Sequence, residues 1–226
     1  LNYPREKIEI IVASDGSTDR TNKIVSRYQT QGVKLITLET NQGKSTAQNL
    51  AVAETRNDIV IFTDANVILQ PDAVRKMVSY FGDEKVGCVI GKVTYLNEGD
   101  TTVSKGESVY WRYELLLRTK ESELGNLAMG SGPIMAIRKE LLKPLDPDVG
   151  EDFVLPLQVA IEGHRIIYDS EAISEEILFQ DFSLSIISRV FIAAAGPIRS
   201  VQNVLLIKDF FALSIIDSFP KIAVIA

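Results

Sequence analysis

An acid and an amide follow directly on an apolar run in the first third of the chain. Residues 59–62 (IVIF) fit a strand that is buried on both faces, and Thr63, Asp64, Ala65 and Asn66 come next. Parallel α/β sheets bury such strands and bind ligands at their carboxyl ends. In an extended chain Asp64 and Asn66 would point to the same side, where their oxygens suit a hard divalent cation with a phosphate partner. A strand end closed by an Asx turn is the alternative interpretation.

A second acidic turn lies nearer to the start of the chain. Residues 7–13 (KIEIIVA) predict a buried strand, which runs into residues 14–19 (SDGSTD) and then a helix. Gly16 permits a tight turn, and Asp19 is a good helix cap. Capping accounts for Asp19 but not for Asp15, which would lie at the carboxyl end of the strand and could accept hydrogen bonds from a base or a ribose. The alternative is that the whole turn serves only as a cap.

A lysine stands where a helix is predicted to begin. Residues 33–38 predict a second strand, and the turn at residues 41–43 leads to a helix that starts with Lys44. A cation is disfavoured beside the positive end of the helix macrodipole, and an anionic ligand would remove this conflict. The alternative is a solvated lysine that costs a few tenths of a kcal/mol.

Two adjacent acids open a later predicted helix. Glu151 and Asp152 follow Gly150 and precede a helix that is expected to stop at Gly163. Acids at a helix N-terminus are stabilised by the macrodipole, which accounts for the pair without any function. In the functional alternative, Asp152 is a general base.

An aromatic residue and a pair of glycines carry weaker signals. Residues 103–124 predict a long amphipathic helix whose Trp111 could stack on a sugar ring, although aromatics at helical spacing also fit a core. Gly130 and Gly132 precede a short predicted strand at residues 134–137 and allow close backbone approach. They do not continue as the dinucleotide fingerprint, so a nicotinamide-binding fold is disfavoured.

These residues need a scaffold of alternating strands and helices. One further helix is expected between Pro71 and Gly82, and one further strand at residues 86–93. The buried stripe of that helix would consist of Val74, Met77, Val78 and Phe81. Strand and helix alternate, which predicts an α/β fold with a mostly parallel central sheet flanked by helices.

The composition excludes several classes of function. The 226 residues carry a net charge of −6 with a pI near 5.0, and no Lys/Arg cluster stands out, so nucleic acid is not an expected partner. The single cysteine, Cys88, cannot form an internal disulfide, which fits a reducing cytosolic compartment. The only histidine, His164, is expected to be a structural or surface residue, and there is no Cys/His cluster for zinc.

The last part of the chain differs in composition from the rest. From residue 177 the sequence is apolar with sparse charges such as Arg189. Such segments predict amphipathic helices in a membrane interface, whose cations reach back to the headgroups, and residues 222–226 could begin a spanning helix. The chain opens without the basic and apolar regions of a signal peptide, and both of its ends look cut.

Three acidic motifs occur in a fixed order, and each closes a strand or opens a helix. They are SDGSTD at residues 14–19, TDAN at residues 63–66 and GED at residues 150–152. Together they resemble the family 2 glycosyltransferases with the GT-A fold, in particular the processive, membrane-associated type related to cellulose and hyaluronan synthases. The resemblance covers nearly all of residues 1–190. It implies a GT-A (Rossmann-like) catalytic domain at residues 1–176 that lacks the family's first strand. It also implies a C-terminal apolar helical tail at residues 177–226, leading to a transmembrane region.

The resemblance implies a role for each candidate residue. Asp15 would contact the base of a nucleotide sugar, expected to be a UDP-sugar, and Lys44 would face the nucleotide or diphosphate. Asp64 looks like the first acid of the family's D-x-D motif and, with Asn66, would bind Mg²⁺ or Mn²⁺. Asp152 matches the base of the E-D motif. The remaining implied substrate-binding residues are Glu151, Gly130, Gly132, Trp111 and Arg189, the last in place of a richer basic motif.

The implied reaction is an inverting, metal-assisted transfer of a sugar to a polysaccharide or lipid hydroxyl at the cytoplasmic face of a membrane. Asp152 would take the proton of the attacking hydroxyl, and no second carboxylate is needed for a covalent intermediate. Asn66 stands where the family usually has a second Asp, and its amide lacks the charge. This departure and the reduced basic motif favour an alternative, a non-catalytic relative that binds a nucleotide sugar or acts as a scaffold in a membrane complex.

Overall fold

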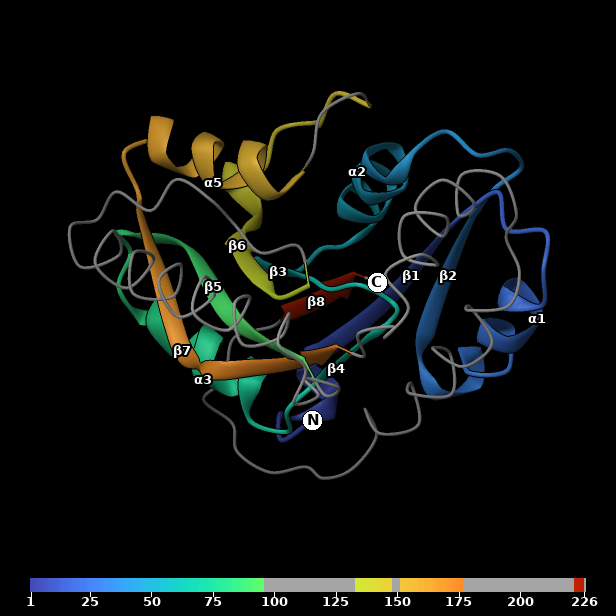
Figure 1. Ribbon diagram of the computed structural model, residues 1–226, viewed down its shortest axis with the longest axis horizontal. Helices are drawn as coiled ribbons and strands as arrows, with labels where there is room; N and C mark the ends of the chain where they lie inside the picture. Colours follow the sequence, from blue (N-terminus) through green and yellow to red (C-terminus); the bar gives the residue numbers. More distant parts are fainter. Residues whose placement is uncertain (96–132, 148–150, 177–221, 226) are drawn as a thin grey trace, which may run out of the picture.

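The computed structural model describes residues 1–95, 133–147, 151–176 and 222–225. Within these residues the strands form one mixed sheet in the order β2-β1-β8-β3-β6-β5-β7-β4, with helices on both of its faces (Figure 1). The sheet is the scaffold that carries the candidate residues at its strand ends.

Four neighbouring strands form the parallel part of the sheet. They are β2 (Val33–Leu38), β1 (Ile8–Asp15), β8 (Ile222–Ile225) and β3 (Ile59–Phe62). Ile225 of β8 lies opposite Ile11 of β1 on one side and opposite Phe62 of β3 on the other. The carboxyl ends of β1 and β3 therefore point to the same end of the sheet, with β8 between them.

The other strands give the sheet its mixed character. β6 (Met135–Arg138) is antiparallel to both β3 and β5 (Val86–Tyr95), β7 (Arg165–Glu176) is parallel to β5, and β4 (Val67–Leu69) is antiparallel to β7. Four of the seven pairings in the described sheet are parallel and three are antiparallel. The prediction of a mostly parallel sheet is therefore corrected to a mixed one. The expectation of parallel pairing applies to consecutive strands that are joined by a helical crossover. β6 is not such a strand, because it lies between β3 and β5, which come from an earlier part of the chain.

Helices cover both faces of this sheet. α2 (Lys44–Glu54) and α5 (Glu151–Ile161) lie on one face, and α3 (Ala73–Ser79) lies on the other (Figure 1). α1 (Thr21–Ser26) packs against β1 and β2 at one end of the sheet. Short 3₁₀ helices are η1 (Arg5–Lys7), η2 (Gln29–Gln31), η3 (Tyr80–Gly82) and η4 (Lys139–Leu141).

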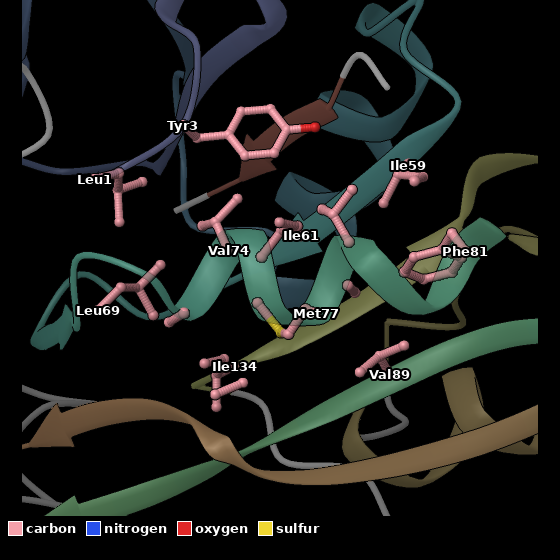
Figure 2. Close-up of a cluster of buried hydrophobic side chains, with 14 of the residues drawn as sticks. Leu1, Tyr3, Ile59, Ile61, Leu69, Val74, Met77, Phe81, Val89 and Ile134 are labelled. Carbon is pink, nitrogen blue, oxygen red and sulfur yellow. The ribbon is translucent and has the colours of Figure 1, made fainter. Parts of the chain in front are cut away.

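Both faces of β3 are buried, which confirms the interpretation of its continuous apolar run. Ile59 and Ile61 are at most 2% exposed and pack against α3 (Figure 2). Val60 and Phe62 point to the opposite cluster, to which α2 and α5 contribute. The predicted stripe of α3 and η3 is also buried, and its members are Val74, Met77, Val78 and Phe81. Because burial of one such side chain contributes about 1.5–3 kcal/mol, both layers hold β3 in place.

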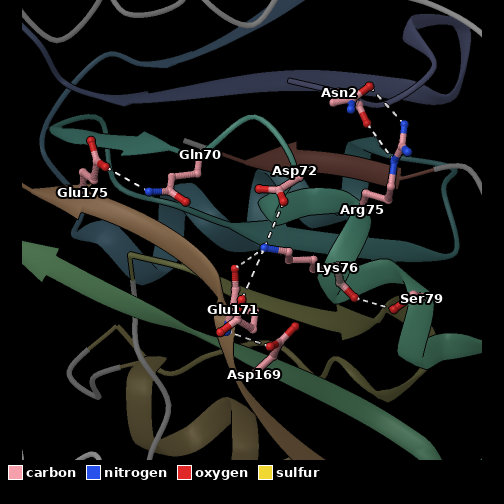
Figure 3. A network of polar contacts seen from close by, with 9 residues as sticks. All are labelled: Asn2, Gln70, Asp72, Arg75, Lys76, Ser79, Asp169, Glu171 and Glu175. Atoms are coloured by element: carbon pink, nitrogen blue, oxygen red, sulfur yellow. Dashed lines mark hydrogen bonds and ion pairs between the residues drawn. The ribbon is translucent and has the colours of Figure 1, made fainter.

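A polar network connects α3 to an irregular part of β7. The pairing of β5 with β7 skips residues 170–172. Lys76 donates to the carbonyl oxygen of Glu171 at 2.8 Å and pairs with Asp72 at 2.9 Å (Figure 3). Asp169 accepts a hydrogen bond from the backbone N–H of Glu171 at 2.9 Å. These contacts satisfy backbone groups that the strand pairing leaves open.

The C-terminal segment differs from its prediction. Where the sequence predicts the start of a spanning helix at residues 222–226, Ile222–Ile225 form β8 with parallel partners on both sides. A short apolar run does not distinguish a strand from a buried helix by itself. The amphipathic helix predicted at residues 103–124 and the interfacial helices predicted at residues 177–221 lie outside the described residues. Of the helices that the structure describes, none combines the length and the apolar character needed to cross a membrane.

Candidate active site

The carboxyl ends of β1 and β3 carry two of the candidate acids. Asp15 is the last residue of β1, and Asp64 lies two residues beyond the end of β3. Thr63, which directly precedes Asp64, is buried and donates a hydrogen bond to the carbonyl oxygen of Pro133 at 3.0 Å. This bond fixes the direction in which the chain leaves β3 before Asp64.

Four predicted substrate-binding residues cannot be placed in this arrangement. Pro133 is described, but the preceding Gly130 and Gly132 lie outside the described residues, and so do Trp111 and Arg189. Their roles stay predictions.

Lys44 joins two candidate acids that are distant in the sequence. Its Nζ lies 2.6 Å from Oδ1 of Asp64 and also contacts Oε1 of Glu151. The three side chains come from the start of α2, the end of β3 and the start of α5. Their exposed fractions are 51% for Lys44, 29% for Asp64 and 10% for Glu151. Burial of a carboxylate is costly without a partner, and Lys44 is the cation that the structure places against Glu151.

The ion pairs resolve the electrostatic conflict that the sequence shows at the start of α2. Burial lowers the pKa of Lys44, but the charge of Asp64 and hydrogen bonds to Asp64 and Glu151 outweigh burial, so the pKa of Lys44 is raised above its ordinary value. The sequence predicts an anionic ligand beside Lys44, and in the structure the chain's own carboxylates take that place. Half of the lysine side chain is still exposed, so it is accessible to a phosphate.

Asp15 holds the turn that precedes Lys44. Its Oδ1 accepts a hydrogen bond from the backbone N–H of Gln42 at 2.7 Å, and its Oδ2 accepts one from that of Gly43 at 2.8 Å. Asp19 accepts from the backbone N–H of Thr21 at 2.9 Å, but the N-cap of α1 is Arg20, so the predicted cap is corrected to a turn just before the helix. Asp15 does not cap α1, in agreement with the sequence analysis, and instead binds the backbone amides of the turn before α2. Each carboxylate oxygen retains a second lone pair, so contact with a nucleotide base stays a prediction.

Gly16 lets the two turns approach each other. Its φ is +65°, and a Cβ atom at this position would lie 2.4 Å from the backbone nitrogen of Asn41. Only glycine adopts this conformation routinely and leaves room for the neighbouring chain. The turn after β1 and the turn before α2 therefore pack directly against each other at the carboxyl end of β1.

Asn66 lies in a turn and not in an extended strand. β3 ends at Phe62, and the backbone N–H of Val67 donates to the carbonyl oxygen of Asp64 at 3.2 Å. The prediction that Asp64 and Asn66 share a side rested on strand alternation, and that premise does not hold here. Instead, the Asn66 side chain donates from Nδ2 to Oε1 of Glu176 at 2.7 Å. The sequence analysis did not find Glu176, because 110 residues separate it from Asn66 and it carries no local motif.

The two acids at the start of α5 have different environments. Glu151 is buried, with 8% of its surface exposed, and contacts Lys44. Asp152, the predicted base, is exposed on the first turn of the same helix. The structure thus brings Glu151 together with Lys44 and Asp64, while Asp152 lies beside this group on the solvent side.

The oxygen donors at the end of β3 fit a divalent cation that is completed by a ligand. Asp64 offers a partly exposed carboxylate, and Asn66 offers an amide oxygen, since its nitrogen is committed to Glu176. No group of three or more His, Cys, Asp or Glu side chains that could hold a metal occurs among the described residues. Mg²⁺ commonly binds one or two protein oxygens together with substrate phosphates and water. The types of donor therefore match those that bind Mg²⁺ or Mn²⁺ together with a diphosphate, and their arrangement around one cation stays a prediction.

Comparison with known families and proteins gives a consistent result. The family model described as glycosyl transferase family 2 matches residues 1–145. The probable glycosyltransferase YdaM of Bacillus subtilis (strain 168) is 28% identical over 187 residues, which cover 78% of this chain and 44% of YdaM. An N-acetylglucosaminyltransferase of Rhizobium meliloti (strain 1021) is 29% identical over 188 residues, covering 76% of this chain and 44% of that protein. The poly-beta-1,6-N-acetyl-D-glucosamine synthase of Staphylococcus epidermidis is 26% identical over 180 residues, covering 76% and 43%. The chain thus spans less than half the length of these relatives.

Two solved structures resemble the chain in fold. The mannosyltransferase PcManGT from Pyrobaculum calidifontis, in complex with GDP-Man and Mn²⁺, has a TM-score of 0.66 and 22% identity over 92% of this chain and 61% of that one. S. aureus TarS in complex with UDP-GlcNAc has a TM-score of 0.61 and 17% identity over 92% and 63%. At these identities the likeness concerns the fold alone. The chain has a GT-A-like α/β fold with a mixed, curled sheet.

Proposed function

The chain belongs to glycosyltransferase family 2, and from this membership we propose that it transfers a sugar from a nucleotide-diphosphate sugar to a hydroxyl group of a glycan or lipid acceptor. The observation that carries the proposal is the meeting of Lys44, Asp64 and Glu151 at the carboxyl edge of the sheet. Three elements deliver a cation and two carboxylates to one place, where α/β proteins bind their ligands. An ion pair that served only stability could lie anywhere on the protein and would not need to lie at the carboxyl ends of the strands.

Two side chains are the proposed cation ligands, and a third is the proposed diphosphate partner. Asp64 and Asn66 would hold Mg²⁺ or Mn²⁺ through one oxygen each, and Lys44 would contact the diphosphate. When bound, the cation would neutralise charge that builds up on the departing diphosphate. Lys44 already lies against Asp64 and is half exposed, so it could exchange a carboxylate partner for a phosphate without a change of fold.

Asp152 is the proposed general base. It is exposed on the first turn of α5, next to the buried Glu151 that contacts Lys44. It would accept the proton of the acceptor hydroxyl as that oxygen bonds to the anomeric carbon and the bond from this carbon to the diphosphate breaks. A single displacement of this kind inverts the anomeric configuration, and the proton ends on the Asp152 carboxylate.

The names of the relatives favour a particular donor class. Two relatives are named for N-acetylglucosamine transfer or polymerisation, and the TarS structure contains UDP-GlcNAc. PcManGT contains GDP-Man with Mn²⁺. A UDP-sugar, with UDP-GlcNAc first among them, is therefore the proposed donor, and Asp15 is the proposed contact for the base. The apolar composition after residue 177 supports an enzyme that works at a membrane, with its catalytic domain on the cytoplasmic side.

A non-catalytic relative that binds a nucleotide sugar is the second candidate. Two observations favour it: Asn66 has no charge, and Lys44 already has two carboxylate partners without a ligand. Such a protein would bind the donor and transfer nothing.

The test combines binding with turnover on the purified protein. Melting temperatures are measured with UDP, GDP and CDP, with and without Mn²⁺, and sugar release from UDP-GlcNAc is measured alongside. A ligand at 100 times its Kd adds about 2.7 kcal/mol to stability, so binding gives a clear shift. We expect a Mn²⁺-dependent shift with one nucleoside diphosphate, lost in Asp64→Ala and kept in Glu54→Gln, a control in an exposed surface ion pair with Lys34. No shift with any nucleotide overturns the proposal, and a shift without any turnover favours the non-catalytic relative.

A further inference from the structure

We propose that Glu176 is a positioning residue of the cation site, which fixes the amide of Asn66 and carries the negative charge that position 66 lacks. The proposal rests on the proposed function, because it assumes that Asn66 helps to bind a divalent cation. The observation is the hydrogen bond from Nδ2 of Asn66 to Oε1 of Glu176 at 2.7 Å.

The sheet delivers Glu176 to this place. β4 pairs antiparallel with β7, and Val67 lies opposite Glu176, the last residue of β7. Asn66 immediately precedes Val67, so the strand pairing brings its backbone next to Glu176. Because Asn66 lies in the turn before β4, its side chain is not bound by the alternation of the strand and reaches Glu176. Both are partly buried, which limits how far water can weaken the contact.

The chemistry of the two groups fixes which way the amide faces. An ionised carboxylate only accepts hydrogen bonds, so the atom of Asn66 that faces Glu176 is the NH₂ nitrogen. The flipped amide would set two acceptor oxygens against each other. Oδ1 of Asn66 therefore points away from Glu176, and a cation ligand at this position is preorganised by its neighbour. Partners of this kind set the orientation of metal ligands in many proteins.

The same contact accounts for the amide at position 66. An aspartate there would place a carboxylate against Glu176, and like charges in contact repel each other. An acid at position 66 beside the acid at position 176 is therefore expected to destabilise this chain. In this chain Glu176 carries the carboxylate, and it is hydrogen-bonded to the amide group whose oxygen is the proposed cation ligand.

A second amide–carboxylate pair on the same two strands provides a matched control. Gln70, just after β4, donates from Nε2 to Oε1 of Glu175 at 3.1 Å (Figure 3). The donor and acceptor groups are of the same types, and the strand pairing is the same, but Gln70 is not among the proposed cation ligands.

The first experiment measures the Kd of Mn²⁺ in the presence of UDP, by electron paramagnetic resonance of free Mn²⁺. Glu176→Ala should weaken Mn²⁺ binding about 10–100-fold. Glu176→Gln keeps an acceptor oxygen for Asn66 but removes the charge, so its loss should be smaller. Glu175→Ala should stay within about twofold of the wild type. Unchanged Mn²⁺ affinity in folded Glu176→Ala and Glu176→Gln overturns the inference while leaving the proposed function intact. A wild type that binds neither Mn²⁺ nor UDP overturns both.

The second experiment measures the contact without metal or nucleotide. Melting temperatures are compared for wild type, N66D, E176Q and the double variant N66D/E176Q. N66D should lower the melting temperature through repulsion, and E176Q should restore it, because the double variant again pairs one carboxylate with one amide. If the two changes simply add, the side chains are not coupled and the inference fails.

Discussion

Lys44 and Asp64 form an ion pair with 2.6 Å between Nζ and Oδ1, although they are 20 residues apart in the sequence. Lys44 is the first residue of α2, and Asp64 follows the end of β3. The contact connects the N-terminus of α2 to the carboxyl end of β3. Glu151 reaches the same nitrogen from α5, so the helices on one face of the sheet share one charged centre. Because this centre is partly buried, we expect it to contribute to the stability of this end of the sheet and, in the proposed function, to the binding of an anionic donor.

Replacing Lys44 should therefore affect stability and donor binding together. Lys44→Met leaves the buried Glu151 without its cation, and we expect a loss of about 1 kcal/mol in unfolding free energy, since half of the lysine is exposed to solvent. The affinity for a nucleoside diphosphate should fall as well. Urea denaturation and titration calorimetry measure the two effects. Lys34→Met, which breaks an exposed pair with Glu54, should change neither by more than the experimental error. Equal stability of the two variants would show that the centre contributes nothing beyond a surface pair.

The contribution of Lys44 should depend on pH in a defined direction. Its pKa is raised in the folded state, chiefly by the charge of Asp64 against the opposing effect of burial. A raised pKa means that the stabilisation is complete below the unfolded value of about 10.4 and is lost as the pH rises through the folded value. The difference in unfolding free energy between wild type and Lys44→Met should thus stay constant from pH 7 to about 10 and shrink above it. Urea denaturation across this range checks the prediction, and a difference that vanishes near neutral pH would contradict it.

Gly16 should tolerate no side chain. With φ at +65° and a Cβ position 2.4 Å from the backbone nitrogen of Asn41, Gly16→Ala must displace the turn that Asp15 holds before Lys44. We expect a loss of at least about 1–3 kcal/mol in stability, the usual cost of a strained backbone position. Thermal denaturation is the measurement. Gly82→Ala is the control, because nothing lies within 4 Å of its Cβ position and its φ is not positive; a similar loss in both variants would refute the argument from close approach.

Local features of the fold were predictable from the sequence. The strand at residues 33–38 and that at 59–62 have the predicted bounds. Residues 59–62 are a contiguous apolar run, and residues 33–38 are rich in apolar and β-branched residues between turn residues. The stripe of α3 was predictable for a similar reason, since Met77 and its neighbours repeat with helical spacing.

Relationships between distant segments were not predictable. The antiparallel β6 and the strand β8 depend on which partners are open in the sheet, and short apolar runs carry no information about strand direction. Asp15 meets its amide partners 27 and 28 residues later. Glu176 lies next to Asn66 only because β4 and β7 pair in one register. The sequence therefore predicts site residues that lie in a local motif, and it does not predict those that only strand pairing brings to the site.

Cys88 should react only when the protein unfolds. It is completely buried, and burial raises the pKa of its thiol well above the ordinary value. The thiolate is the reactive form, so both exposure and ionisation are suppressed in the native state. With an unfolded fraction of about 10⁻³ or less, labelling by a thiol reagent at pH 8 should be at least about a thousandfold slower than in urea. Because Cys88 is the only cysteine, mass spectrometry of the labelled chain reports on this site alone. Rapid native labelling would show that β5 opens locally.

Replacing each of the two acids at the start of α5 should change different kinetic parameters. Asp152→Asn removes the proposed base from an exposed position, so kcat should fall by about 10²–10⁴ while donor binding stays near that of the wild type. Glu151→Gln removes the buried partner of Lys44. It should raise KM for the donor and lower the melting temperature, with a smaller effect on kcat. Steady-state kinetics with UDP-GlcNAc and thermal denaturation distinguish the two patterns. If Glu151→Gln abolishes turnover with donor binding intact and Asp152→Asn remains active, the buried acid is the base, and its contact with Lys44 must then break before the acceptor is deprotonated.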